Sequence, residues 1–337
     1  MNPVREPRRH SDTGGPDVSI LIVGYNSADL IAACLASIES ACRLYSREIL
    51  LIDNGDGSTE RLVARCFPHV AIVPSRGNIG FAAGNNLLAR EARGRFLLLL
   101  NPDVELLPEA IDRLLDAAVR ASAQDVAWGG VTLDRNGKPS LGNSVHAPTL
   151  HEMASRVVGR SAARLAPADN LDANRSVEVL SGSFVLIERG AWDAVDGLDE
   201  RYFLYCEEVD FFYRLARLGK RFNHIAAARA YHDVGHGQSA SPMRELYLTT
   251  GKVQFARLHW SRPRRLAALL LLWAASLQRY LAGRLLGAAM PRLRPLAERN
   301  RLTALRPHWW MHGYDPPSGL SNRLGLPTPS EGSAHRG

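Results

Sequence analysis

Short apolar runs alternate with amphipathic segments along the N-terminal third of the chain. Val18–Gly24, Glu48–Asp53 and Arg95–Leu100 are rich in valine, isoleucine or leucine and show no polar alternation. Such runs are typical of strands buried on both faces of a parallel sheet. Between the first two runs, apolar residues recur at helical spacing, namely Leu30, Ile31, Cys34, Leu35 and Ile38. Repeated strand–helix–strand units predict an α/β fold with a doubly wound, mostly parallel sheet and helices on both faces.

The pattern continues less regularly further along the chain. Additional strands are expected at Val70–Pro74, Val126–Leu133 and Arg221–Tyr231. Additional helices are expected at Ser58–Cys66, with Ser58 as its cap, at Phe81–Ala92, and from Pro108 to Ser122. Val177–Ile187 is a strand interrupted by small residues, which let a ligand or another backbone approach closely. Residues 146–174 lack clear periodicity beyond a short helical stretch and predict a variable loop region.

Polar residues follow the expected strands of the N-terminal half. In open α/β sheets, ligands bind beyond the carboxyl ends of the strands. The residues at these ends are Asn26, Asp53, Asn54, Gly77, Asn78 and Asn101 to Asp103. This set predicts a ligand with hydrogen-bonding groups, and the Asp103 carboxylate adds the prospect of a metal ion.

Three carboxylates interrupt an aromatic and apolar run at residues 203–214. If this segment begins a helix, Glu207 and Asp210 share one stripe with Arg214, and Glu208 lies at its edge. A carboxylate held against apolar neighbours loses hydration, so its pKa rises and it becomes a general base near neutral pH. The structural alternative is that the acids favour a helix N-terminus and that Asp210 pairs with Arg214. The segment alone leaves both interpretations open.

Several motifs follow one another along residues 18–240. They are Val18–Asn26, Ile52–Asn54, Gly77–Asn86, Leu100–Val104, Ser181–Phe184 and Tyr205–Asp210. Their order resembles glycosyltransferase family 2, and within it the rhamnosyltransferase-like members. The resemblance implies a GT-A fold and transfer of a sugar from a nucleotide-diphosphate donor to an acceptor hydroxyl, with inversion at the anomeric carbon.

The resemblance also implies roles for individual residues. Asp103 matches the last position of the family's Asp-x-Asp motif and would hold Mg²⁺ or Mn²⁺, while Asn101 replaces the first aspartate. Glu208 matches the family's base, with Glu207 and Asp210 as alternatives, because Glu stands here where Asp is usual. His232, with His236 as the alternative, falls where related enzymes bind metal or phosphate. The donor-binding candidates are Asn26, Asp53, Asn54, Gly77, Asn78, Gly80, Asn86, Asn101, Ser181 and Gly182. Simple turns at Asn54 and at Asn101–Asp103 are the structural alternative.

The composition is that of an ordinary globular protein. The 337 residues are 46% hydrophobic and 22% charged, which suits one large or two ordinary domains. The four cysteines include no Cys-x-x-Cys pair and lie in apolar or helical patterns, so free thiols in a reducing compartment are expected. Residues 1–17 lack the apolar core of a signal peptide and predict a disordered tail.

Positive charge is concentrated toward the C-terminus. The chain carries +7 overall, while residues 257–306 hold 11 arginines and a single acid. The apolar run Leu266–Leu277 is shorter than the about 20 residues that span a bilayer. With Trp260, Trp273 and the flanking arginines, it predicts a helix pair lying in an anionic membrane interface. A core helix or a dimer interface is the alternative. Nucleic acid binding is not favoured, because aromatic and basic residues are not interleaved as in RNA-binding sheets.

The expected organisation is a tail at 1–17, a catalytic domain at 18–245, a basic helical extension at 246–306 and a tail at 307–337. Within the catalytic domain, 18–105 forms the nucleotide-binding half and 106–245 the acceptor half. We expect an inverting, metal-dependent glycosyltransferase that uses dTDP-rhamnose or a UDP-sugar and a lipid-linked or cell-surface glycan acceptor. It would work in the cytoplasm at the inner face of the cell membrane, with its oligomeric state left open. The alternatives are a non-catalytic, membrane-associated sugar-nucleotide-binding or scaffold protein, and a sugar nucleotidyltransferase.

Overall fold

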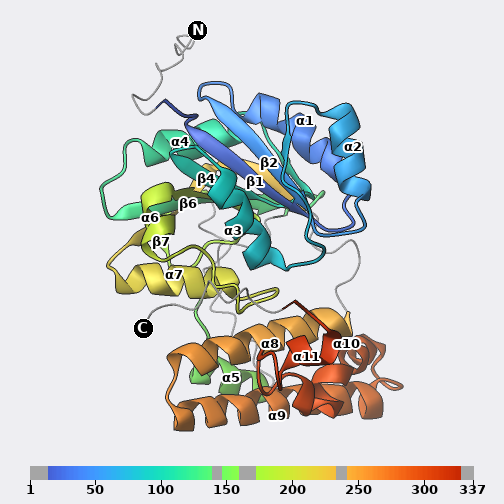
Figure 1. Ribbon diagram of the computed structural model, residues 1–337. Coiled ribbons are helices and arrows are strands. Elements are labelled where there is room, and N and C mark those ends of the chain that lie inside the picture. The colour runs from blue at the N-terminus through green and yellow to red at the C-terminus, as the bar shows by residue number, and fades with distance from the viewer. Residues whose placement is uncertain (1–13, 139–145, 159–171, 233–240, 328–337) are drawn as a thin grey trace. The chain divides into compact units, whose positions relative to one another are not determined.

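The computed structural model describes residues 14–138, 146–158, 172–232 and 241–327 (Figure 1). The chain divides into two compact units. Among the described residues, the sheet unit comprises 14–138, 146, 172–198 and 211–232, and the helical unit comprises 147–158, 199–210 and 241–327. Helix α7 (Glu207–Arg217) therefore begins in the helical unit and ends in the sheet unit. This division differs from the expected boundary at residue 245, because residues 199–210 pack with the C-terminal helices.

One sheet runs through the sheet unit. Among the described residues its strands are ordered β3-β2-β1-β4-β8-β6-β9-β5, and β7 pairs with β9. The strands are β1 (Val18–Gly24), β2 (Arg47–Asp53), β3 (Ala71–Ile72), β4 (Phe96–Leu100), β5 (Val104–Leu106), β6 (Asp125–Leu133), β7 (Arg175–Val177), β8 (Phe184–Glu188) and β9 (Arg221–His232).

The sheet is parallel in its first half and mixed in its second. Strand β1 runs parallel to β2 and β4, whereas β8 runs antiparallel to β4 and β6. The expected α/β sheet is therefore confirmed, with more antiparallel pairing than its first half suggests.

Helices cover both faces of the sheet, as expected (Figure 1). Helices α1 (Ile31–Ala41) and α4 (Ala110–Ala118) share a core with Ile20 and Ile22 of β1. Helix α3 (Phe81–Glu91) covers the other face, where Gly84 lies against Val23. The sheet unit also contains α2 (Ser58–Cys66) and α6 (Arg189–Ala194). Because successive side chains of a strand point to opposite faces, these two cores lie on either side of β1.

Some local details differ from the expected pattern. Helix α2 begins at Ser58, but its cap is Gly57 in a left-handed conformation, and the Ser58 side chain makes no capping bond. Helix α4 begins at Ala110 rather than Pro108, directly after Glu109 in the same left-handed region. The short helical stretch expected within residues 146–174 is α5 (Leu150–Val157), which forms behind a Thr149 cap. Strand β5 was not predicted, since three residues are too few to show a pattern.

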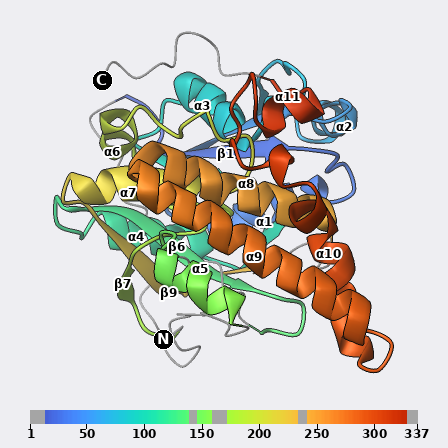
Figure 2. The ribbon, with the colours of Figure 1, turned by 90° about the horizontal axis from the view of Figure 1, so that it is seen from below.

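The helical unit is dominated by long helices near the C-terminus. They are α8 (Pro242–His259), α9 (Arg262–Leu286), α10 (Arg294–Leu305) and α11 (Leu320–Leu324), with 3₁₀ turns at Pro291–Leu293 and Pro307–Trp309. Helix α9 packs along α5, α8 and α10 (Figure 2). Residues 307–327, expected as part of a tail, contribute the fully buried Trp310 and the buried Tyr314 to this unit.

Candidate active site

The carboxyl ends of β1 and β2 form the first part of the candidate site. Gly24 and Asp53 pair at this edge of the sheet. Asp53 is fully buried, and its two carboxylate oxygens accept hydrogen bonds from the backbone N–H groups of Gly55 (2.7 Å) and Glu60 (3.1 Å). Both oxygens therefore hold the turn into α2. The expected contact between Asp53 and a nucleotide stays a prediction.

The loops after β2 and β3 bring several expected donor-binding residues together. Asn54 donates through Nδ2 to the Gly80 carbonyl (2.9 Å), and Asn78 accepts from the Gly80 N–H (3.3 Å). The Asn54 Oδ1 atom is buried and has no hydrogen-bond partner among the described residues. Gly77 (φ 74°) and Gly80 (φ 86°) adopt conformations that favour glycine. A polar ligand suits this glycine-lined start of α3, because an unpaired acceptor is already present there.

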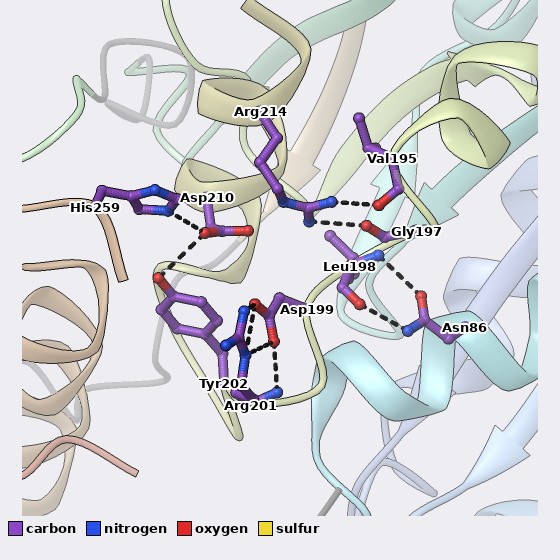
Figure 3. Close-up of polar contacts among 10 residues, drawn as sticks. All are labelled: Asn86, Val195, Gly197, Leu198, Asp199, Arg201, Tyr202, Asp210, Arg214 and His259. Atoms are coloured by element: carbon purple, nitrogen blue, oxygen red, sulfur yellow. Dashed lines mark hydrogen bonds and ion pairs between the residues drawn. The ribbon is translucent and has the colours of Figure 1, made fainter. Parts of the chain in front are cut away.

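Two further donor-binding candidates differ in their surroundings. Asn26 is exposed in the left-handed region (φ 49°), which asparagine tolerates. Asn86 is buried and donates through Nδ2 to the Leu198 carbonyl (2.7 Å), while its Oδ1 accepts from the Leu198 N–H (3.0 Å; Figure 3). These bonds give Asn86 a structural role that needs no ligand.

The loop before β8 lies beside the end of β4. The Asn101 N–H donates to the Ser183 carbonyl (3.0 Å), and the Ser181 and Ser183 hydroxyl oxygens are 2.9 Å apart. Gly182 lies between the two serines. The structure thus brings together the expected residues Asn101, Ser181 and Gly182.

Asp103 and His232 are brought together by the pairing of β5 with β9. Val104, which follows Asp103, pairs with His232 in antiparallel register. The distance from Asp103 Oδ1 to His232 Nε2 is 3.3 Å. The same carboxylate oxygen is buried without a hydrogen-bond partner in the described chain. A carboxylate oxygen in this state beside an imidazole nitrogen fits a divalent cation.

The number of protein ligands at this position is small. The described ranges contain no group of three or more His, Cys, Asp or Glu side chains that could hold a metal ion. Mg²⁺ and similar ions often take only one or two protein ligands and complete their shell with water and substrate phosphates. Asp103 and His232 fit this arrangement. His236, the alternative ligand, lies outside the described residues.

Glu207 and Glu208, the acid pair, begin α7 within the helical unit. Glu207 is only 4% exposed, and its Oε2 atom has no hydrogen-bond partner in the part of the chain described, whereas Glu208 is half-buried. Burial raises the pKa of Glu208 above its ordinary value of 4.5. Burial, and then the charge of Glu208, raises the pKa of Glu207 well above the same value. The Glu207 carboxyl group is therefore desolvated and that of Glu208 partly so, which agrees with one of the two interpretations that the sequence left open.

Asp210, one turn further along α7, has a different environment. Its side chain is fully buried, with Oδ1 2.6 Å from His259 Nε2 and 3.5 Å from the Tyr202 hydroxyl (Figure 3). Sequence reasoning missed His259, because it lies 49 residues beyond Asp210 and no local pattern relates the two. In the sheet unit, Arg214 donates to the carbonyls of Val195 and Gly197.

Known proteins resemble this chain over most of its length. Residues 19–167 match glycosyl transferase family 2. The N-acetylglucosaminyl-diphospho-decaprenol L-rhamnosyltransferase of Mycobacterium tuberculosis is 32% identical over 253 residues, which cover 67% of this chain and 79% of that enzyme. The chain belongs to glycosyl transferase family 2. The expected resemblance and the expected glycosyltransferase activity are confirmed. This glycosyltransferase is also 27% identical to the rhamnosyltransferase WbbL of Escherichia coli, over 65% of this chain and 84% of that enzyme.

Solved structures support the same fold. The mannosyltransferase of Pyrobaculum calidifontis, in complex with GDP-mannose and Mn²⁺, matches with a TM-score of 0.53 and 15% identity, over 94% of this chain and 91% of that one. GalNAc-T7 with UDP, GalNAc and Mn²⁺ matches with a TM-score of 0.54 and 16% identity, over 87% and 55% of the two chains. At these identities the similarity concerns the fold alone, and the expected GT-A architecture is confirmed.

The raised pKa of Glu207 gives the enzyme a pH-dependent loss of stability. The folded state binds more protons at this group than the unfolded state, so stability falls as pH rises from about 4.5 through the raised pKa. Glu207→Gln removes the charge. We expect it to raise Tm by a few degrees at about pH 8 and to change Tm little at about pH 4, measured by scanning fluorimetry.

Glu39→Gln, at an exposed position of α1, is the matched control and should leave Tm unchanged at both pH values. A Glu207→Gln variant that is destabilised at about pH 8 contradicts a desolvated carboxyl group at this position.

Proposed function

We propose that this glycosyltransferase is a metal-dependent, inverting enzyme that transfers rhamnose from a nucleotide-diphosphate donor to a lipid-linked glycan acceptor. The observation that carries the proposal is the desolvated acid pair at the start of α7. Inversion in one step needs a base on the face of the sugar opposite the leaving group. A carboxyl group with a raised pKa suits this role, because it accepts a proton more readily than an ordinary carboxylate.

Glu208 is the proposed base, and Glu207 is its protonated neighbour. Adjacent carboxyl groups resist double ionisation, because each charge raises the pKa of the other. The proton resides on Glu207, which is the more buried of the two. Glu208 then remains the accessible carboxylate. It takes the proton of the acceptor hydroxyl as that oxygen bonds to the anomeric carbon, while the nucleoside diphosphate leaves from the opposite face with the electron pair of the broken bond.

Asp103 and His232 are the proposed ligands of Mg²⁺ or Mn²⁺. Asp103 supplies a carboxylate oxygen and His232 a ring nitrogen, and the two atoms are 3.3 Å apart. When bound, such an ion stabilises the negative charge on the leaving diphosphate. The Mn²⁺ in both solved structures of similar fold supports a divalent ion here.

The names of the two relatives support the choice of sugar and acceptor. Both the mycobacterial and the E. coli relative are rhamnosyltransferases, and the first is named for an N-acetylglucosaminyl-diphospho-decaprenol acceptor. We therefore propose dTDP-rhamnose, or else a UDP-sugar, as the donor. Asn54, Gly77, Asn78 and Gly80 are the proposed donor-binding residues at the start of α3, where backbone groups and the unpaired Asn54 oxygen are available.

Helix α9 supports a peripheral position on the inner face of the cell membrane. Leu266, Leu270, Trp273 and Leu281, the α9 stripe, are 59%, 64%, 38% and 42% exposed and follow helical spacing along one side. The opposite side, including Leu272, is buried in the helical unit. A helix that is apolar on two sides needs a second apolar environment. The surrounding arginines favour anionic lipid as that environment.

A position on the membrane suits α9 better than a position across it. By length and composition this 25-residue helix could cross a membrane, since it extends well beyond the apolar run of residues 266–277. However, Arg279 and Arg284 lie in its C-terminal half, and Arg279 donates to the backbone carbonyl of Arg156 in α5 (3.4 Å). Peripheral docking through the α9 stripe keeps this contact, and Arg284, an exposed residue near the end of the helix, can reach the lipid headgroups with its charge.

Donor and metal binding test the site at Asp103. In thermal-shift titrations, dTDP-rhamnose or UDP-glucose with Mn²⁺ or Mg²⁺ should raise Tm, and chelation of the metal should abolish the shift. Asp103→Ala should lose the metal-dependent shift, whereas Asp193→Ala, at an exposed position of α6, should keep it. Normal metal-dependent binding by Asp103→Ala refutes the metal role. The absence of any shift in the wild type favours a non-catalytic scaffold.

Transfer of labelled rhamnose to synthetic N-acetylglucosaminyl-diphospho-polyprenol tests the base. Glu208→Gln should lower kcat by roughly 10²- to 10⁴-fold, because an amide cannot take the proton. Its donor affinity should stay near that of the wild type, and Glu39→Gln should be fully active. Full activity of Glu208→Gln moves the base to Glu207 or Asp210.

Vesicle flotation tests the α9 stripe. A variant with Leu266→Gln, Leu270→Gln and Leu281→Gln should bind phosphatidylglycerol vesicles at least about tenfold more weakly than the wild type, because about 0.8 kcal/mol is lost per CH₂ group no longer buried. Leu218→Gln with Leu305→Gln, at exposed positions outside the stripe, is the control. Unchanged vesicle binding refutes membrane docking. Loss of a dimer in sedimentation would assign the stripe to a second copy of the chain.

A further inference from the structure

The turn that precedes the acid pair adopts a conformation that its own residues disfavour. Tyr205 (φ 67°) and Cys206 (φ 72°) occupy the left-handed region in succession. Non-glycine residues are uncommon there, and such conformations persist only where the surrounding structure holds them. Several contacts that hold this turn come from α8, in the same unit.

Helix α8 approaches the turn most closely at Gly251. A Cβ atom at this position would lie 2.4 Å from the Tyr205 carbonyl oxygen and 3.0 Å from the Cys206 Sγ. Only glycine permits this approach. One turn earlier on α8, Tyr247 stacks on Phe203, with the ring centroids 5.9 Å apart. Helix α8 thus packs against both the backbone of the turn and the ring of Phe203 that precedes it.

His259 holds the next turn of α7 from the far end of α8. Its Nε2 atom is 2.6 Å from Asp210 Oδ1, and its ring packs on Phe255 with centroids 4.7 Å apart. The Tyr202 hydroxyl donates a hydrogen bond to the same oxygen (3.5 Å). The positive charge of Arg201 also interacts electrostatically with Asp210 within this unit. Asp210 follows Glu207 by three residues, so the two lie on one side of the helix, a turn apart.

We infer that α8 positions the acid pair for transfer, with His259 as a positioning residue and Gly251 as the point of close approach. This inference rests on the proposed role of Glu208 as the base. His259 acts through Asp210, whose placement fixes the direction in which the first turn of α7 presents Glu207 and Glu208. Misplacing a catalytic group by about an ångström costs roughly two orders of magnitude in rate. Loosening either contact should therefore lower turnover more than donor binding, which is proposed to use residues of the sheet unit.

Matched variants separate positioning from general stability. His259→Phe keeps a ring against Phe255 but removes the nitrogen that meets Asp210, and His259→Gln restores a donor. Gly251→Ala places a methyl group against the turn. Gly283→Ala is the control, since its Cβ would lie 2.5 Å from Ala297 N of α10 and so strains helix packing in the same unit away from the turn.

The readouts are kcat and the donor KM with dTDP-rhamnose and the synthetic acceptor, together with amide hydrogen exchange at residues 202–210. His259→Phe and Gly251→Ala should each lower kcat at least about tenfold, change the donor KM less than about threefold, and speed exchange at 202–210. His259→Gln should recover most of the lost kcat. Gly283→Ala should lower Tm but leave kcat and this exchange unchanged.

Different results would contradict the positioning role of α8 and the proposed function. An active wild type with unchanged kcat in His259→Phe and Gly251→Ala overturns the positioning role, as do losses that merely follow Tm in all variants, Gly283→Ala included. A wild type without transfer activity overturns the proposed function. In that case hydrogen exchange still decides the inference, because unchanged exchange at 202–210 in both variants overturns it.

Discussion

Two adjacent carboxyl groups, of which Glu207 is buried and Glu208 is half-buried, impose the strongest physical constraint on this enzyme. Desolvation disfavours the charged form of each group, and their repulsion adds to that penalty. The arrangement therefore needs stabilisation from the remainder of the helical unit. Three features constrain the chain next to the pair. They are the left-handed turn at Tyr205 and Cys206, the close approach of Gly251 to that turn, and the buried contact between Asp210 and His259. Stability is commonly sacrificed in this way at sites that carry chemistry.

The sheet unit depends on a constraint of another kind, which is strand register. Asp103 and His232 come from distant parts of the chain and meet only because Val104 pairs with His232. A slip of one residue in this pairing would turn the side chains to the opposite face of the sheet. The short strand β5 therefore fixes the relative position of two proposed metal ligands, although it adds little to the sheet as a whole.

How much of this structure can be predicted from the sequence depends on how far apart along the chain the interacting residues lie. Strands β1 and β2, helix α2 and the start of α7 were predictable, because burial pattern and helical spacing are properties of neighbouring residues. The motifs around Asp103 and Glu207 were found for the same reason. Asn86 was expected to bind the donor, which stays a prediction, and the sequence did not show that it also bonds to the backbone of Leu198, 112 residues away. His259 was missed for a similar reason, because its proximity to Asp210 depends on how α8 packs.

The buried Tyr314 lies far beyond the motifs of the family, yet its hydroxyl donates to the carbonyl of Leu204, 110 residues earlier. During translation at about 5–20 residues per second, the carboxylate turn therefore leaves the ribosome roughly 5 to 20 seconds before the residue that completes its surroundings. The surroundings of the carboxylate turn therefore form only after the chain has extended 110 residues beyond Leu204.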